Sequence, residues 1–344
     1  MRRILLAISV LSMLAACVGS SAVAEDKETQ KGRFKVDMAS SYYWCYVPEK
    51  YNGDGTTGVI LVMHGSGGTA DGMLSCFMYK DGGGTYLDEN NYICICPKSV
   101  RLEGWEEKDP LPMTALNDVM AKYKVDKKRI HIFGFSNGGF FTSWQYYERL
   151  DLFRTGVIAA AFLVYANMAT VKKNPNKPMF FIFGEKDPNR QGAEQNYDQL
   201  ISFGSKYVRK FMMEGEEHNI PFQKEFPRLF KWYTAMESGY DYAAALEKAA
   251  KAVKAKIESA MELVAEVEKH PEEDVFWEQL ARIKKEINDA GEKRLKSLIS
   301  MYKPKPEDLI KRLKEFEERF KGYPVADKAK EEREKAEAAV KPAG

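Results

Sequence analysis

Short apolar segments recur along the chain before Gly239, and each ends in glycine or in polar residues. They lie at residues 59–63, 92–96, 129–135, 155–164, 177–184 and 207–213. β-branched and aromatic residues are frequent in them, which is typical of strands buried in a sheet. Residues 139–147, directly after the third segment, are predicted to form a helix. The pattern therefore predicts an α/β fold with a mostly parallel central sheet.

The pattern changes at Gly239, beyond which glycine is nearly absent and alanine, glutamate and lysine dominate. Apolar residues there recur with helical spacing in three stretches. The stretches are Leu246, Ala249, Val253, Ile257, Ala260, Val264 and Val267, then Phe276, Leu280, Ile283 and Ile287, and, after Pro306, Leu309, Leu313, Phe316 and Phe320. We expect three helices in an all-α module, either a small antiparallel bundle or a hairpin packed on the preceding domain.

The segment Arg129–Gly139 carries the most specific chemical signal. Its apolar strand runs directly into Gly134-x-Ser136-x-Gly138. A nucleophilic serine on a tight strand-to-helix turn needs small residues two positions before and after it, because the main chain is crowded there. The N-terminus of the following helix favours negative charge on an attacked substrate. The motif therefore predicts Ser136 as a nucleophile.

A nucleophilic serine needs a base, and the chain contains four histidines. On turns of this kind the order along the chain is serine, acid, histidine. His64 and His131 precede the serine, and His270 lies in the charged helical region. His218 remains as the predicted base, in the turn-like segment Gly215–Pro221, and an ordinary surface histidine is the alternative interpretation.

The acid is expected at the end of a strand that follows the nucleophile. The apolar segment 177–184 ends in Glu185-Lys186-Asp187-Pro188. Asp187 is the preferred acid, because a carboxylate against the far imidazole nitrogen fixes its tautomer and stabilises the imidazolium. Glu185 is the competitor. The alternative interpretation of Asp187 is a turn residue before Pro188.

A glycine-rich loop follows the first apolar segment and is a candidate oxyanion hole. It reads His64-Gly-Ser-Gly-Gly68. We expect Gly65 or Ser66 to supply one main-chain N–H donor and Asn137 the other. His64 is expected to order this loop. Glycine-rich loops also hold phosphates, but no Lys-Ser or Lys-Thr follows as in a P-loop, which argues against nucleotide binding.

Residues 34–233 resemble the polyhydroxybutyrate-depolymerase and feruloyl or acetylxylan esterase-like branch of the α/β-hydrolases. The matching segments are Val62–Gly68, Val125–Gly139, Phe183–Pro188 and Glu217–Pro221. The resemblance implies an α/β-hydrolase fold and acyl transfer without a cofactor. It also implies Ser136 as nucleophile, Asp187 as acid and His218 as base, in agreement with the residue-based reasoning.

Two departures from this family's pattern concern the substrate. Residues 214–217 read Glu-Gly-Glu-Glu where a glycine-rich turn is usual, and Ile220 stands where tryptophan is usual. The stretch between Ser136 and Asp187 leaves little room for a lid, so we expect a shallow, open site. Trp105 is a candidate substrate contact and equally a candidate packing residue. The resemblance implies carbohydrate-linked acyl or feruloyl esters, or hydroxyalkanoate esters, as substrates.

Two functions of other classes remain open. A serine peptidase of prolyl-oligopeptidase type shares the serine turn and the order of the triad, but we assign no acidic pair to a pocket for a substrate's amino terminus. The other is a non-catalytic envelope adaptor, in which the helical module would bind a protein partner. The presence of all the expected catalytic residues argues against the adaptor.

The first residues resemble a bacterial lipoprotein signal. Arg2 and Arg3 precede an apolar segment at 4–13 that is too short to span a membrane stably, and Leu-Ala-Ala-Cys17 follows. Lipidation of Cys17 would tether the protein to a membrane of the cell envelope. Ordinary secretion with cleavage after Ala24 is the alternative. The predicted organisation is signal 1–17, polar tether 18–32, catalytic domain 33–238 and helical module 239–344.

Four further cysteines, an even number, allow two disulfides in an oxidising compartment. They are Cys45, Cys76, Cys94 and Cys96. Cys94 and Cys96 share one side of a strand, so each is expected to pair with Cys45 or Cys76. Four buried thiols are the alternative. No Cys-x-x-Cys motif and no histidine pair supports a zinc site.

The overall charge is nearly balanced. The chain has 52 basic and 50 acidic residues, which leaves a net charge of +2. Acidic residues are interleaved with the lysines of the helical module. This composition gives no electrostatic case for nucleic-acid binding.

Overall fold

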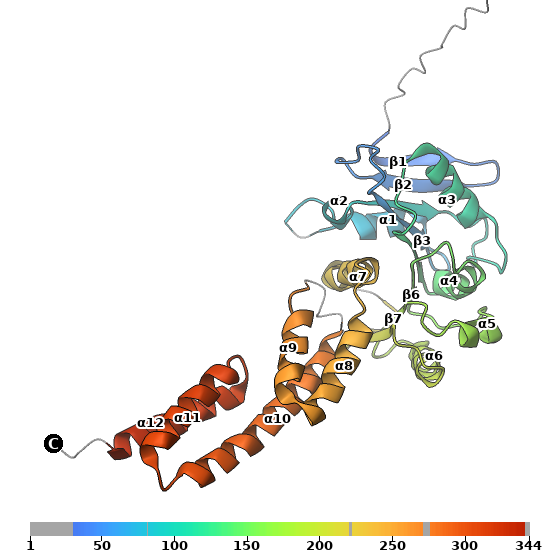
Figure 1. The fold of residues 1–344 in the computed structure, drawn as a ribbon. Coiled ribbons are helices and arrows are strands. Elements are labelled where there is room, and N and C mark those ends of the chain that lie inside the picture. The colour runs from blue at the N-terminus through green and yellow to red at the C-terminus, as the bar shows by residue number, and fades with distance from the viewer. Residues whose placement is uncertain (1–29, 81, 220–221, 271–275, 341–344) are drawn as a thin grey trace, which may run out of the picture. The chain divides into compact units, whose positions relative to one another are not determined.

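The computed structural model describes residues 30–80, 82–219, 222–270 and 276–340 (Figure 1). In these residues, three strands and two helices come first, strands then alternate with helices from β4 to α7, and only helices follow. The strands are β1 (Gly32–Asp37), β2 (Tyr42–Val47), β3 (Gly58–Met63), β4 (Tyr92–Pro97), β5 (Ile130–Phe135), β6 (Thr155–Ala159), β7 (Met179–Gly184) and β8 (Val208–Met213). The helices of this part are α1 (Ala70–Met78), α2 (Tyr86–Asn90), α3 (Leu111–Lys122), α4 (Asn137–Glu148), α5 (Met168–Lys173), α6 (Arg190–Ser202) and α7 (Phe222–Glu237).

The strands form one sheet in the order β1-β2-β4-β3-β5-β6-β7-β8. β2 pairs antiparallel with β1 and β4, and the other neighbouring pairs are parallel. The predicted α/β class and mostly parallel sheet are confirmed. Because the carboxyl ends of parallel strands share one edge, the loops after β3, β5, β7 and β8 meet there.

The apolar segment 155–164 was predicted as one strand, but β6 ends at Ala159. Ala160 has φ 52°, a left-handed conformation that L-residues rarely adopt, and the chain leaves the sheet there. Hydrophobicity continues because the segment beyond the strand remains packed: Ala161 and Leu163 are buried. The apolar pattern therefore continues past the end of the strand and does not show where β6 ends.

Helices cover both faces of the sheet. On one face, α1 and α7 pack against alternate residues of the central strands, such as Ile60 and Val62. On the other face, α3, α4 and α6 pack against the intervening residues, such as Val59 and Leu61. This two-sided burial explains why β3 has no exposed residue and reads as a continuous apolar run.

The region after α7 contains five helices in the described residues, where three were predicted. They are α8 (Tyr242–Ala255), α9 (Ile257–Val267), α10 (Trp277–Tyr302), α11 (Pro306–Arg319) and α12 (Pro324–Val340). Lys256, in an extended conformation, separates α8 from α9. After α11, Gly322 adopts a φ of 87°, which a helix cannot continue. Pro324 then begins α12. These breaks interrupt the backbone without interrupting the apolar spacing.

The helices after Gly239 pack on the sheet domain. Leu246 of α8 and Ile283 of α10 are fully buried in the same hydrophobic cluster as Trp232 of α7. Residues 31–344 form one compact unit. The predicted boundary between 238 and 239 stays a prediction. The lipidation of Cys17, the signal and the tether as far as residue 29 lie outside the described residues and also stay predictions, while Gly32, the last residue of the predicted tether, begins β1.

The four described cysteines are free thiols. Cys94 and Cys96 belong to the cluster on one face of the sheet, whereas Cys45 belongs to the cluster on the other face. The predicted pairing of either strand cysteine with Cys45 is therefore wrong, because the sheet separates the side chains. The alternative of buried thiols holds for Cys45, Cys94 and Cys96, while Cys76 is partly exposed.

A half-buried carboxylate fixes the C-terminal end of α7 to the sheet. Glu237 accepts hydrogen bonds from His131 Nε2 at 2.6 Å and from the Tyr92 hydroxyl, and it pairs with Arg129 Nε at 2.8 Å. Thr155 Oγ1 lies 2.8 Å from the other ring nitrogen of His131. Burial lowers the pKa of His131, which holds it in the neutral form, with Nε2–H as donor. Burial opposes ionisation of Glu237, but the bonds to these partners lower its pKa overall.

We predict that Glu237→Gln destabilises the protein by about 3 kcal/mol at neutral pH, because it leaves Arg129, which is largely withdrawn from solvent, without its carboxylate. The lowered pKa of Glu237 makes its ionised form stabilising above the ordinary carboxyl value of 4.5, and this stabilisation is lost as pH falls through the lower folded value. In urea unfolding, the free energies of unfolding of variant and wild type should therefore differ at neutral pH, and this difference should shrink as the pH falls through the folded pKa of Glu237. The exposed control Glu318→Gln should change little; equal effects of both would contradict the role of Glu237.

Candidate active site

Ser136 lies on the turn between β5 and α4. Its backbone has φ 54° and ψ −120°, a strained conformation that turns the side chain out of the sheet edge. A Cβ on Gly134 would collide with the carbonyl of Gly138, and a Cβ on Gly138 would lie 2.7 Å from the His64 carbonyl oxygen. Both glycines are therefore required by close main-chain approach, as the sequence predicted.

The structure brings Ser136, Asp187 and His218 together from the ends of β5, β7 and β8. His218 Nε2 lies 2.8 Å from Ser136 Oγ, and His218 Nδ1 lies 3.1 Å from Asp187 Oδ1. A carboxylate only accepts, so Nδ1 carries the hydrogen and Nε2 accepts the serine proton. The Asp187 side chain is fully buried, while that of His218 is 36% exposed. This is the geometry of a serine nucleophile with an oriented base.

Glu185, the competing acid, has a different partner. Its Oε2 accepts from the main-chain N–H of Gly215 at 2.9 Å, in the turn after β8. Asp187 instead accepts from the main-chain N–H of Asn189 at 2.7 Å as well as from His218. Glu185 thus fixes the turn that precedes His218 through Gly215, whereas Asp187 contacts the imidazole itself.

The loop that carries His218 lies directly on the end of β7. Lys186 N–H donates to the Glu216 carbonyl at 2.8 Å. A Cβ on Gly184 would collide with the carbonyl groups of Glu216 and Glu217. The unusual segment Glu214–Glu217 is therefore placed by its main chain, which explains how a charged turn occupies this position.

The glycine-rich loop after β3 lies beside the serine. A Cβ on Gly65 would be 3.1 Å from the Ser136 Cβ, and Ser66 Oγ donates to the Glu103 carbonyl at 2.5 Å. Asn137 begins α4, where main-chain N–H groups have no intrahelical acceptor. The loop and the helix start thus lie on either side of Ser136, the arrangement that an oxyanion hole needs.

His64 is buried and orders this loop. Its Nδ1 donates to the Gly65 carbonyl at 2.8 Å, and its Nε2 accepts from Ser99 N–H at 3.1 Å. Burial lowers the pKa of His64, which favours the neutral ring that these two bonds require.

Trp105 does not line an open site, so its predicted role as a substrate contact is not supported. It is only 3% exposed, and its Nε1–H donates to the His64 carbonyl at 2.9 Å. Its main-chain N–H donates to Asn137 Oδ1 at 2.5 Å. Trp105 therefore connects the glycine-rich loop to the start of α4. The Asn137 side chain was missed as part of this connection because the contact joins residues far apart in the sequence.

Two exposed apolar side chains, one of them in contact with the glycine-rich loop through its carbonyl, were also missed. Leu102 is 83% exposed, and its carbonyl accepts from Gly67 N–H in the glycine-rich loop. Val164 is 45% exposed in the segment after β6. Neither follows a period or a motif, so the sequence offered no signal for them. In the described residues, no group of three or more His, Cys, Asp or Glu side chains is placed to hold a metal ion.

The sheet order, the strained serine after β5 and the chain order of the three side chains together decide the fold. The fold is that of the α/β-hydrolases. The sequence model of the prolyl oligopeptidase family matches residues 112–174 of this α/β-hydrolase, which include the serine turn. No helix in the described part of the chain is long and apolar enough to span a membrane.

Comparisons with individual proteins give limited coverage. Feruloyl esterase B of Neurospora crassa is 27% identical over 126 residues, 33% of this chain. The match spans 41% of that curated relative. A ferulic acid esterase structure has a TM-score of 0.49 and 15% identity, covering 60% of this chain and all of that one. A dipeptidyl aminopeptidase IV-like structure from Bacteroides ovatus has a TM-score of 0.42 and 14% identity, covering 62% of this chain and 36% of that one.

We predict that Gly184→Ala slows reaction of Ser136 with a fluorophosphonate by about a hundredfold, because the new methyl group displaces the His218 loop. The rate of covalent labelling measures this directly. Gly204→Ala is a matched control: its φ is 89°, but no atom lies near its Cβ. The control should lose stability from backbone strain and keep its labelling rate. Equal labelling rates of both variants and wild type would show that the close approach is not needed.

Proposed function

We propose that this protein is a serine hydrolase of carboxylic esters. The observation that carries the proposal is the Ser136–His218–Asp187 arrangement, with hydrogen-bonding distances of 2.8 and 3.1 Å between successive members. The similarity of about a third of the chain to a feruloyl esterase supports ester substrates.

In the proposed mechanism, Ser136 Oγ attacks the ester carbonyl while His218 Nε2 takes its proton. Asp187 stabilises the resulting imidazolium, and main-chain N–H groups at Gly65 or Ser66 and at Asn137 hold the oxyanion. The C–O bond to the alcohol then breaks, and the alcohol leaves with the proton from His218. Water repeats the sequence on the acyl-enzyme and releases the acid, which regenerates the serine.

For the substrate, we propose acyl groups on bulky carriers, such as carbohydrate-linked acyl or feruloyl esters or hydroxyalkanoate esters. Between Ser136 and Asp187 the chain forms only α4, β6, α5 and β7, all part of the sheet domain or its cover. No inserted lid therefore lies in this fully described stretch. The exposed Leu102 and Val164 offer apolar surface for an acyl chain or ring.

A peptidase is the second candidate, because the prolyl oligopeptidase family model matches residues 112–174. That match covers the serine turn and neither Asp187 nor His218. It therefore supports a serine hydrolase more directly than it supports cleavage of peptides.

We predict that wild-type protein is labelled by a fluorophosphonate and hydrolyses at least one of an acetylated xylan, a feruloyl arabinoside and a hydroxybutyrate oligomer. Ser136→Ala should abolish labelling and lower turnover on the order of a million-fold. Amide substrates with an amino-terminal X-Pro sequence test the peptidase. Preferred turnover of these amides would replace the esterase proposal, and absence of labelling of folded wild-type protein would reject catalysis by Ser136.

We also propose that the protein is exported and lipidated at Cys17, on the support of the Arg2-Arg3 start, the short apolar segment and Leu-Ala-Ala-Cys17. Cells fed an alkyne fatty acid should incorporate it into wild type and lose incorporation in Cys17→Ser. Mass spectrometry of the mature protein should find modified Cys17 at its N-terminus. An unmodified N-terminus at Glu25 would instead establish ordinary secretion.

A further inference from the structure

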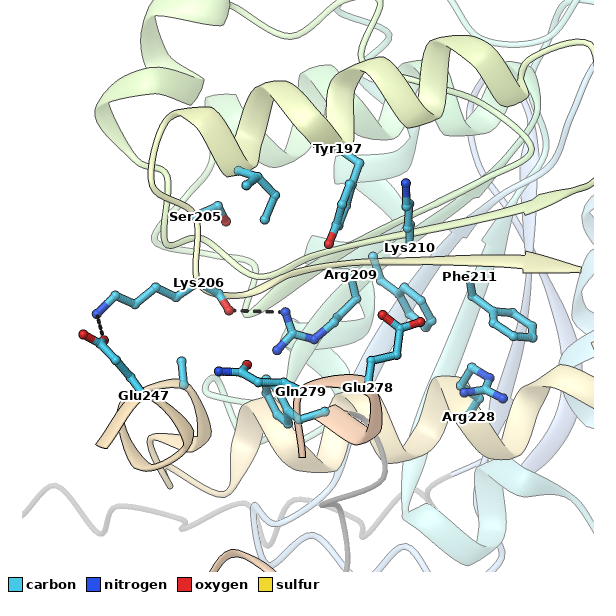
Figure 2. A pocket seen from close by; sticks show the side chains of 14 residues that line it. Tyr197, Ser205, Lys206, Arg209, Lys210, Phe211, Arg228, Glu247, Glu278 and Gln279 are labelled. Atoms are coloured by element: carbon cyan, nitrogen blue, oxygen red, sulfur yellow. Dashed lines mark hydrogen bonds and ion pairs between the residues drawn. The ribbon is translucent and has the colours of Figure 1, made fainter. Parts of the chain in front are cut away.

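A cavity lies away from the catalytic residues, where the start of β8 meets α6, α7, α8 and α10 (Figure 2). Its volume is about 390 Å³, within the range of small-molecule sites. Lys206 and Arg209 lie at the beginning of β8, whereas His218 follows its end. The cavity and the triad therefore occupy opposite ends of this edge strand.

Positive charge is in excess around the cavity. Its charged lining residues are Lys206, Arg209, Lys210, Arg228, Glu247 and Glu278. Lys206 pairs with Glu247 at 3.3 Å, and Glu247 also pairs with Lys251. One of the two carboxylates is thus already shared between two lysines. Among the described residues, Arg209 and Lys210 have no carboxylate within ion-pair distance, which makes the cavity suited to an anion.

Arg209 is the central cation. Its Nη1 donates to the main-chain carbonyls of Val208 at 2.7 Å and Lys206 at 3.4 Å, and its guanidinium lies 4.2 Å from the centre of the Phe276 ring. Among the described residues, no carboxylate oxygen is within 4.0 Å of its nitrogens. Figure 2 shows Arg209 directed from β8 toward Gln279 and Glu278 of α10.

Burial lowers the pKa of Arg209 to about 10, although the nearby Tyr197 and Glu278 oppose this change. A guanidinium withdrawn from water without a carboxylate partner is costly, and a bound anion removes that cost. Arginine also presents a planar pair of donors that matches a carboxylate.

Aromatic rings form the apolar walls. Phe276 is buried and stacks on Tyr242 at 4.8 Å, so its ring is held in place. Lys210 Nζ lies 4.6 Å from the centre of the Tyr197 ring, and Phe180, a buried residue, also lines the cavity. Flat rings beside cations favour a ligand that is itself flat and apolar at one end and negatively charged at the other.

We propose that this cavity binds a small aromatic carboxylate, whose carboxylate pairs with Arg209 and whose ring packs against Phe276 and Tyr197. The ligand would contact both the sheet domain and the helical region, and so stabilise their contact. The site is independent of the proposed esterase activity, because none of its residues belongs to the triad or its loops.

Calorimetric titration of the full chain with 3-phenylpropanoate tests this proposal. We expect binding that is retained in Ser136→Ala, since the two sites are separate. Arg209→Gln should weaken binding by about tenfold to a hundredfold, through loss of a charge-assisted pair. Lys254→Gln, an exposed lysine of α8 outside the cavity, is the charge-matched control and should bind as wild type.

Two further variants keep the test decisive if Arg209→Gln does not fold. Phe276→Leu and Lys210→Gln should each weaken binding severalfold. Equal affinity for the neutral 3-phenylpropanamide would overturn the carboxylate contact, and equal affinity for inorganic phosphate or butanoate would overturn recognition of the ring. Absence of binding to folded wild-type protein at millimolar ligand, or full binding by all the cavity variants, would reject the site.

Discussion

The close approach of main chains at the carboxyl edge of the sheet is the constraint on which the active site depends. Around Ser136, Gly134 lets the end of β5 approach the start of α4, and Gly138 lets that helix start fit against the end of β3. At the end of β7, Gly184 lets the His218 loop lie directly on the strand. Larger residues at these positions would separate the elements by more than a hydrogen bond tolerates. The distances within the triad are consequences of this packing.

A second layer of contacts places the glycine-rich loop, the candidate oxyanion hole. His64 and Trp105 are both buried, and together they join the loop after β3 to the loop after β4 and to the start of α4. Each bond joins a side chain to a main-chain group, and the His64 carbonyl that accepts from Trp105 belongs to the glycine-rich loop itself. Preorganised donors stabilise a developing charge without the cost of reorienting at the moment of reaction.

The opposite edge of the sheet serves a different purpose. There the half-buried Glu237 bonds to His131 and Arg129 and so holds the end of α7, the helix that follows the His218 loop. The helices after Gly239 continue this packing as one hydrophobic cluster. Arg209 lies where that cluster gives way to a hollow, and it has backbone carbonyls and a ring as partners in place of a carboxylate. The contact between strand and helical region thus creates both buried packing and a guanidinium that has no carboxylate partner within the part of the chain that the structure describes.

The buried strands and the serine turn could be predicted from the amino-acid sequence, because they depend on local spacing. His218 could be predicted from the order of residues along the chain and from the small number of histidines. The sequence also restricted the acid to Asp187 or Glu185. The choice between these two came from the tertiary structure, in which Glu185 bonds to Gly215. Three further outcomes also came from it: Trp105 is buried, Cys45 lies across the sheet from Cys94, and the helical region forms five helices in the described chain. Those outcomes depend on contacts between distant segments and on single backbone angles, which leave the pattern of apolar and polar residues unchanged.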